Sequence, residues 1–173
     1  LNDSIVFSLH LLSVKYKVTE LTEITNKYIA DNNENLVFKS ILYKTQMQQN
    51  ESAEVDFSSE EDIIAAHLTS YIDDDQLLSL CVPSIDRILK KFLNNFSDKK
   101  DESQIIEFLF KCLEKYKRKA SVLFLNFDFS KRFDIIQRLM KDYSDVFDFN
   151  LLNSKSQIKT IEDLLNEFSK LKC

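Results

Sequence analysis

The stretch VPSIDRILKKFLNNF, residues 82–96, shows most clearly which kind of structure this chain adopts. Its apolar residues recur at spacings of three and four, the period of one face of an α-helix: Ile85, Ile88, Leu89, Phe92 and Phe96. Pro83 stands at the first turn, where its missing N–H leaves no helical hydrogen bond unmade. The stretch therefore predicts an amphipathic helix that packs along one side.

Similar helical periods recur along most of the 173 residues. We predict helices over residues 3–16, 19–29, 35–47, 58–71, 76–80, 83–96, 101–119, 120–127, 128–140 and 156–168, with polar connections at 30–35, 48–57 and 97–102. The first helix is apolar on most sides, which predicts a buried, central position. Side chains that can cap a helix precede most of these segments: Asp3, Thr19, Asn35, Ser58 with Glu61, Asp101 with Gln104, Asp128 or Ser130, and Ser156 or Thr160. Ser144 is predicted to cap a short turn that runs through Phe149.

These helices predict an all-α fold, either a bundle or a short α-solenoid of about nine helices in antiparallel pairs. The lack of glycine and the single proline favour helices over a sheet protein with many turns. We place a domain boundary at the polar break 97–102, which gives helical units 1–96 and 97–173. One pattern occurs twice at the same spacing and hints at repeated helix–turn–helix units: Val6, Leu9, Tyr16 and Lys17 match Ile106, Leu109, Tyr116 and Lys117.

Composition excludes several classes of function. A chain without glycine cannot build a Rossmann fingerprint, a phosphate-binding P-loop or a nucleophile elbow. The formal net charge of −5 disfavours a nucleic-acid partner, and no apolar run is long enough to predict a membrane span. Because the chain begins with Leu1, we expect it to be a piece of a longer protein.

The run Asp73-Asp74-Asp75 looks most like a binding site. Consecutive side chains on a helix point apart, so the three carboxylates do not converge on one cation. The alternate spacing and the glycine of a calcium loop are also missing. We therefore interpret the aspartates as caps for the short helix that follows, with a metal site as the alternative.

The basic run KYKRK, residues 115–119, closes a predicted helix, where cations meet the last carbonyl groups favourably. A patch for an anionic partner is the alternative. His10 lies on an apolar helix and is predicted to be a hydrogen-bonded core histidine, and His67 is expected to be similar. The cysteines are too far apart for a zinc site and predict reduced thiols, with Cys81 and Cys112 in the core and Cys173 exposed.

The segment LHLLSVKYKVTELTEITNKYI, residues 9–29, resembles the helical end of BTB domains. The segment LLSLCVPSIDRIL, residues 77–89, is similar to a stretch of the BACK-type helical extension in BTB proteins of unicellular eukaryotes. Residues 105–129 and 143–154 resemble the helical region that precedes ankyrin repeats in those proteins. Such relatives carry a glycine after "KY", where this chain has Lys117. The resemblance implies scaffolding, such as dimerisation or recruitment into a larger complex.

We expect a non-enzymatic protein–protein interaction or scaffold module, the helical part of a longer BTB/ankyrin-type protein located in the cytoplasm. Its partners would be proteins, including a further copy of itself, and not nucleic acid or a membrane. No residue is predicted to be catalytic, to bind a cofactor or to bind a metal. Two alternatives stay open: a structural component of a cytoskeletal or other large assembly, and a viral Bcl-2-like helical regulator. The chain lacks the NWGR-like segment that is usual in the Bcl-2-like family.

Overall fold

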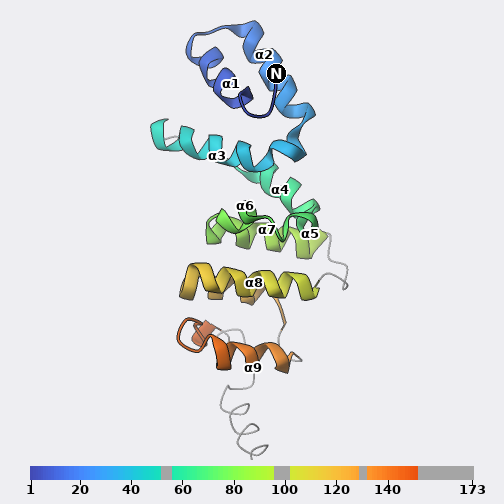
Figure 1. Ribbon diagram of the computed structural model, residues 1–173, viewed down its shortest axis with the longest axis vertical. Coiled ribbons are helices and arrows are strands. Elements are labelled where there is room, and N and C mark those ends of the chain that lie inside the picture. The colour runs from blue at the N-terminus through green and yellow to red at the C-terminus, as the bar shows by residue number, and fades with distance from the viewer. Residues whose placement is uncertain (52–55, 96–101, 129–131, 152–173) are drawn as a thin grey trace, which may run out of the picture. The chain divides into compact units, whose positions relative to one another are not determined.

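The computed structural model describes residues 1–51, 56–95, 102–128 and 132–151, with the side chains of 47–51 and 133 excepted. Every regular element in these ranges is a helix and none is a strand (Figure 1). The all-α prediction is therefore confirmed. The helices are α1 (Val6–Lys15), α2 (Thr19–Asp31), α3 (Asn33–Glu51), α4 (Ser58–Ala66), α5 (Leu68–Tyr71), α6 (Asp75–Ser79), α7 (Val82–Asn95), α8 (Glu102–Tyr116), the 3₁₀ helix η2 (Lys117–Asn126) and α9 (Phe133–Asp142).

The chain forms two compact units, Leu1–Tyr71 and Ile72–Cys173. The sequence placed the boundary instead at the polar break 97–102. The segments on either side of that break belong together because η2 packs against α7. The Asn126 amide also donates a hydrogen bond to Asp86 of α7 over 2.8 Å.

In the first unit, α1 and α2 lie side by side and run in opposite directions. Their side-chain contacts show this, because they join residues early in one helix to residues late in the other. The Tyr28 hydroxyl donates to Asp3 over 2.9 Å, and Thr22 donates to Ser13, also over 2.9 Å. Helix α3 packs against α4, and both contribute to the buried core through Leu36, Val37, Ile64 and Ala65.

In the second unit, the predicted amphipathic helix is α7, and Pro83 is its second residue. Its predicted inward positions Ile85, Ile88, Leu89 and Phe92 are all buried. Helix α8 lies between α6 and α9 (Figure 1) and contributes the most buried side chains of any helix in the described residues. Aromatic rings join α8 to the segments that follow it, with ring centroids 5.0–5.6 Å apart: Phe110, Phe124, Tyr143, Phe147 and Phe149.

Several predicted helix limits were wrong. The connection expected at 30–35 is reduced to Asn32, because α3 already begins at Asn33. The helix expected over 58–71 is interrupted at His67, which ends α4 with a non-helical backbone. The helix expected at 120–127 is part of a 3₁₀ helix that begins at Lys117 and ends at Asn126. The connection at 48–57 starts later than expected, since α3 continues to Glu51.

Five predicted caps were also wrong, because the side-chain oxygen binds elsewhere or the helix begins at another residue. Thr19 is the first residue of α2, whose N-cap is Val18, and α3 begins at Asn33, before Asn35. The N-cap residue of α1 is Ile5, while Asp3 accepts the Tyr28 hydroxyl. The N-cap of α4 is Phe57, and the Ser58 hydroxyl donates to Asp56. Helix α9 begins after Arg132, beyond Asp128. The expected caps at 101, 130, 156 and 160 and the last predicted helix lie outside the described residues.

Among the described residues, no helix combines the length and apolar character that crossing a membrane requires.

Candidate protein-interaction face

Helix α1 was expected at the centre of the fold, and this prediction was wrong. Only Val6 and Ser13 of its ten residues are buried. The helix contacts its own unit along one side, through α2 and through Tyr43 of α3, whose ring lies 5.1 Å from that of Phe7. The helix therefore has more apolar side chains than its contacts inside the unit bury.

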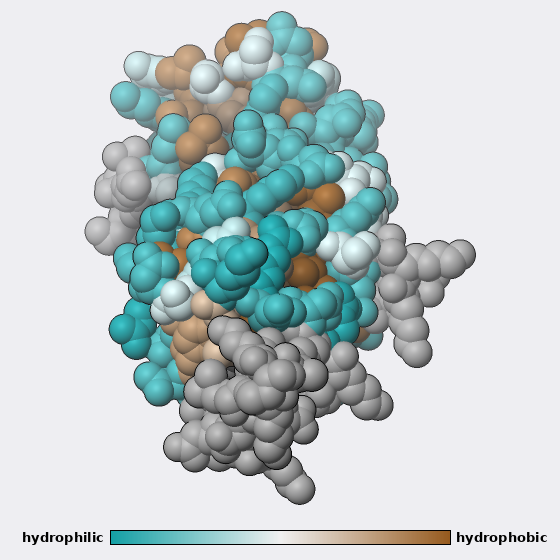
Figure 2. All heavy atoms as spheres, turned by 60° about the horizontal axis from the view of Figure 1, so that its bottom comes forward, coloured by the Kyte–Doolittle hydropathy of each residue, from teal (hydrophilic) through white to brown (hydrophobic). Residues whose placement is uncertain are grey.

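Exposed large apolar side chains are concentrated at this helix. Eight of the ten such residues in the described ranges lie within the first 24 residues: Leu1, Ile5, Leu11, Leu12, Val14, Tyr16, Val18 and Ile24. In the view of Figure 2, polar residues cover most of the described surface and apolar side chains appear between them in patches. We call Ile5, Leu11, Leu12 and Tyr16 the α1 face. They are 44%, 40%, 46% and 67% exposed, and at the helical period Ile5, Leu12 and Tyr16 share one stripe with Leu11 beside it; a concentration of exposed apolar side chains is typical of interaction sites.

A polar seam holds α1 against α2 beside this face. The Thr25 hydroxyl donates to the carbonyl groups of Leu21 and Thr22. His10 Nδ1 lies 3.0 Å from the same Thr25 oxygen, so the histidine belongs to this seam. Burial lowers the pKa of His10. The predicted hydrogen bond of His10 is confirmed, but the ring is half-buried rather than part of the core. His67 is exposed and lies 3.6 Å from Glu34, so its prediction was wrong.

The end of α1 is closed by an arrangement that usually contains glycine. The Val18 N–H donates to the Ser13 carbonyl over 2.8 Å and the Lys17 N–H to the Val14 carbonyl over 3.2 Å, which is the Schellman pattern. Lys17 has a φ of 57°, in the left-handed region that costs a residue with a Cβ roughly 1–2 kcal/mol. Lys15 Nζ lies 5.8 Å from the centre of the Tyr16 ring, so one cation lies over the exposed phenol.

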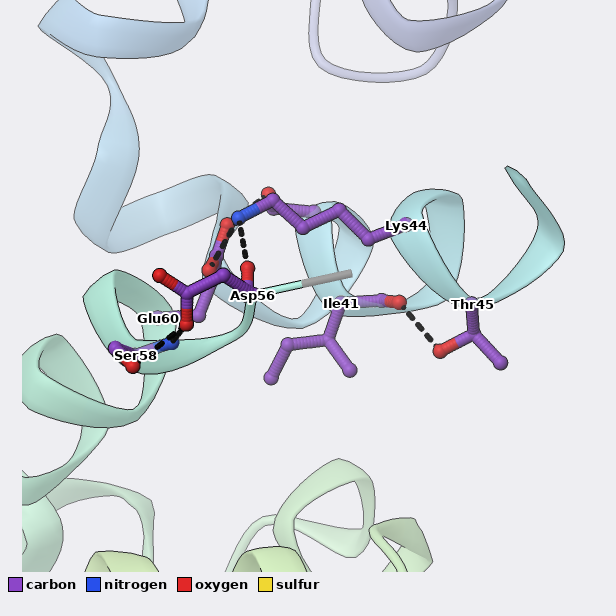
Figure 3. A network of polar contacts seen from close by, with 7 residues as sticks. Ile41, Lys44, Thr45, Asp56, Ser58 and Glu60 are labelled. Atoms are coloured by element: carbon purple, nitrogen blue, oxygen red, sulfur yellow. Dashed lines mark hydrogen bonds and ion pairs between the residues drawn. The ribbon is translucent and has the colours of Figure 1, made fainter. Parts of the chain in front are cut away.

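A buried carboxylate lies on the other side of the first unit, between α3 and α4 (Figure 3). Glu60 is 7% exposed and accepts the Ser40 hydroxyl over 2.6 Å. Lys44 Nζ lies 2.7 Å from the second oxygen of Glu60 and 2.9 Å from the Asp56 carbonyl. Both oxygens are thus occupied, and the group fastens α3 to α4. The sequence analysis did not predict this group. The one available signal was the position of the acid Glu60 in the first turn of a helix, on the side that faces the core.

A pocket of about 290 Å³ opens beside Glu60. Its apolar wall includes Leu36, Val37 and Ile63, and its polar wall includes Asn26 and Asn33. This volume is at the lower limit for small-molecule sites. Because the Glu60 oxygens already bind Ser40 and Lys44, the pocket presents no free carboxylate for acid–base chemistry.

The aspartates 73–75 cap a helix, as predicted. Asp74 is the N-cap residue of α6, and its carboxylate accepts the Gln76 N–H over 2.8 Å. Asp73 instead pairs with Lys111 of α8 over 2.8 Å, and Asp75 lies in the first turn. The three side chains thus take separate roles, and no group of three or more potential metal ligands occurs in the described part of the chain.

The KYKRK run also lies at a helix end, as predicted. Helix α8 stops at Tyr116, and Lys117 adopts a φ of 54°. Arg118 pairs with Asp148 over 2.8 Å and thereby lowers the pKa of that carboxyl group. The Tyr116 hydroxyl reaches the carbonyl oxygens of Leu78 and Leu80, 2.6 and 2.8 Å away. Tyr116 therefore closes the C-terminal end of α6, and burial raises its pKa.

The cysteines differ from each other. Cys112 is buried, as predicted, and burial raises its pKa to about 12. Cys81 was expected in the core but is exposed, because it lies in the short connection between α6 and α7. Cys173 is outside the described residues.

Comparison with protein-family models, with curated proteins and with solved structures found no match.

Proposed function

We propose that this chain is a non-enzymatic protein–protein interaction module that binds its partner through the α1 face. The observation that carries the proposal is the concentration of exposed apolar side chains on α1 and its flanks. Covering such a face with a protein partner removes its apolar area from water, which stabilises the complex by about 25 cal/mol for each Å².

Three described groups that could serve an enzyme, Glu60, His10 and Cys112, are engaged in structural contacts or buried, which agrees with the proposal. Glu60 is paired with Lys44, His10 binds Thr25, and the thiol of Cys112 is held protonated by its raised pKa. The BTB/BACK-type scaffold suggested by residues 9–29 and 77–89 agrees with an interaction role. Within the proposal, the partner is a protein of a larger cytoplasmic assembly.

The test uses the full chain as bait, as wild type, as Leu12→Asp and as Leu42→Asp. Leu42 is a matched control because it is also exposed, at 60%, and lies on α3 of the same unit. We expect a partner that wild type and Leu42→Asp retain and that Leu12→Asp loses, while circular dichroism stays the same for all three. Equal retention by the two variants, or no retained partner at all, would refute the proposal.

A further inference from the structure

Helices α1 and α8 are two versions of one structural element. Both end in Lys-Tyr-Lys, and both place the last lysine in the left-handed region, with φ values of 57° and 54°. In both, the preceding lysine lies over the tyrosine ring, at 5.8 and 5.5 Å. The two helices can therefore be compared residue by residue, from Ile5 with Ile105 to Tyr16 with Tyr116.

One side of each helix has a neighbour within its own unit. On α8, Phe110 lies 5.2 Å from the Tyr143 ring after α9, and Glu114 accepts the Tyr143 hydroxyl over 2.9 Å. On α1, the residue that corresponds to Phe110 is His10, which lies 6.0 Å from the Tyr43 ring of α3. This side is therefore occupied in both versions.

The other side is covered only on α8. Ile105 and Cys112 are 2% and 0% exposed, whereas their counterparts Ile5 and Leu12 are 44% and 46% exposed. Two polar contacts place α6 beside the C-terminal half of α8, from Lys111 to Tyr116. Tyr116 binds the last carbonyl groups of α6, and Lys111 pairs with Asp73 just before α6.

We propose that the α1 face receives the C-terminal turn of a helix from a partner protein, as α8 receives α6. The inference rests on the proposed function and specifies its partner. The Tyr16 hydroxyl, which has no hydrogen bond among the described residues, would donate to a last-turn carbonyl group. Leu12, one turn before Tyr16, would cover apolar side chains of the same partner turn.

Charge complementarity supports a helix C-terminus as the occupant. The exposed Lys15 and Lys17 flank Tyr16, and neither has a carboxylate partner in the part of the chain that the structure describes. The last carbonyl groups of a helix carry a partial negative charge, equivalent to about half an elementary charge. Two cations and a phenolic donor therefore suit this end of a helix and disfavour its positive N-terminal end.

The experiment places the photo-crosslinking residue p-benzoylphenylalanine at position 12 of the full chain, with position 42 as the matched control. After irradiation in cells, the cross-linked partner peptides are sequenced. We expect cross-links from position 12, and not from position 42, to residues in the last turn of a helix. In a binding assay with the partner thus identified, Tyr16→Phe should weaken affinity about three- to tenfold, the effect of one hydrogen bond.

The possible results distinguish failure of the inference about the helix end from failure of the proposed interaction function. Cross-links to a helix middle, a strand or a loop, or an unchanged affinity for Tyr16→Phe, would overturn the inference and leave the interaction role intact. A cross-link to the last turn of a helix in a second copy would support it and identify the partner as this chain. A cross-link between position 12 and another residue of the same molecule would overturn the inference that a partner protein occupies the α1 face. No excess of cross-links at position 12 over position 42 would overturn both proposals.

Discussion

The hydroxyl oxygen of Tyr116 lies 2.6 Å from the carbonyl oxygen of Leu78, and this contact ties the end of α8 to the end of α6. The last carbonyl groups of a helix have no partner within the helix, so a side-chain donor here replaces water. The corresponding Tyr16 has the same local sequence but an exposed ring. Comparing the same substitution at Tyr116 and at Tyr16 therefore measures how much this hydrogen bond contributes to the free energy of unfolding.

We expect Tyr116→Phe to reduce the free energy of unfolding by about 1–2 kcal/mol, because the carbonyl groups of α6 lose their buried donor. Tyr16→Phe removes the same atom from an exposed ring and should leave stability within about 0.5 kcal/mol of wild type. Urea unfolding followed by circular dichroism measures both. Equal losses in the two variants would contradict the role assigned to Tyr116.

Lys17→Gly and Lys117→Gly should each stabilise the protein by about 0.5–1 kcal/mol, since glycine adopts positive φ without the steric cost paid by lysine. Lys15→Gly is the control. Lys15 is inside α1, where glycine costs about 1 kcal/mol relative to good helix formers. Melting temperatures should therefore rise for the first two variants and fall for the third.

Glu60→Ala should destabilise the first unit by about 1–3 kcal/mol, because Ser40 and Lys44 both lose their partner in a largely buried site. Glu60→Gln keeps an acceptor for Ser40 and should lose less. Glu23→Ala is a suitable control because Glu23 is an exposed acid of the same unit. Hydrogen exchange of the α3 and α4 amides would locate the effect, and a uniform change over both units would argue against a local clamp.

Acidification should destabilise the first unit through His10. Burial lowers the pKa of His10 below its ordinary 6.5, so the unfolded chain binds the proton more readily than the folded chain. The contribution of His10 is complete above pH 6.5 and is lost as the pH falls from there through the lowered pKa. His10→Gln should flatten this part of the stability profile, and NMR titration of the ring should give the pKa directly.

Iodoacetamide should label Cys81 much faster than Cys112 in the folded protein. The reactive form is the thiolate, and burial both raises the pKa of Cys112 to about 12 and shields its sulfur. Peptide mapping by mass spectrometry distinguishes the sites. In urea, the two rates should become similar, whereas fast native labelling of Cys112 would mean that α8 is not packed as described.

Local sequence was a good guide wherever the determining interaction is itself local. The spacing of Ile85, Ile88 and Phe92 predicted α7, and the acid at position 74 predicted the start of α6, because both effects act within a turn or two. Burial is different, since it depends on neighbours far along the chain. The apolar residues of α1 predicted a central helix. The spacing of apolar residues shows which side of a helix can be covered, but it does not show whether the covering element belongs to the same unit.

The candidate site shows the same limit. Tyr16 and Tyr116 both stand in a Lys-Tyr-Lys sequence, and the repeated pattern marked both. Only the packing of α6 distinguishes them, because it covers one tyrosine and not the other. The Glu60 group was not predicted at all, since Ser40 and Lys44 approach it from a separate helix.

The chemistry of the α1 face also restricts the symmetry of any complex that it forms. A two-fold axis through Tyr16 would bring Lys15 and Lys17 against their own copies, which Coulomb repulsion opposes. We therefore expect contact through this face to be heterologous, with different surfaces on the two partners. If the partner is a second copy, successive copies add head to tail, and the product is a ring or a filament rather than a closed dimer.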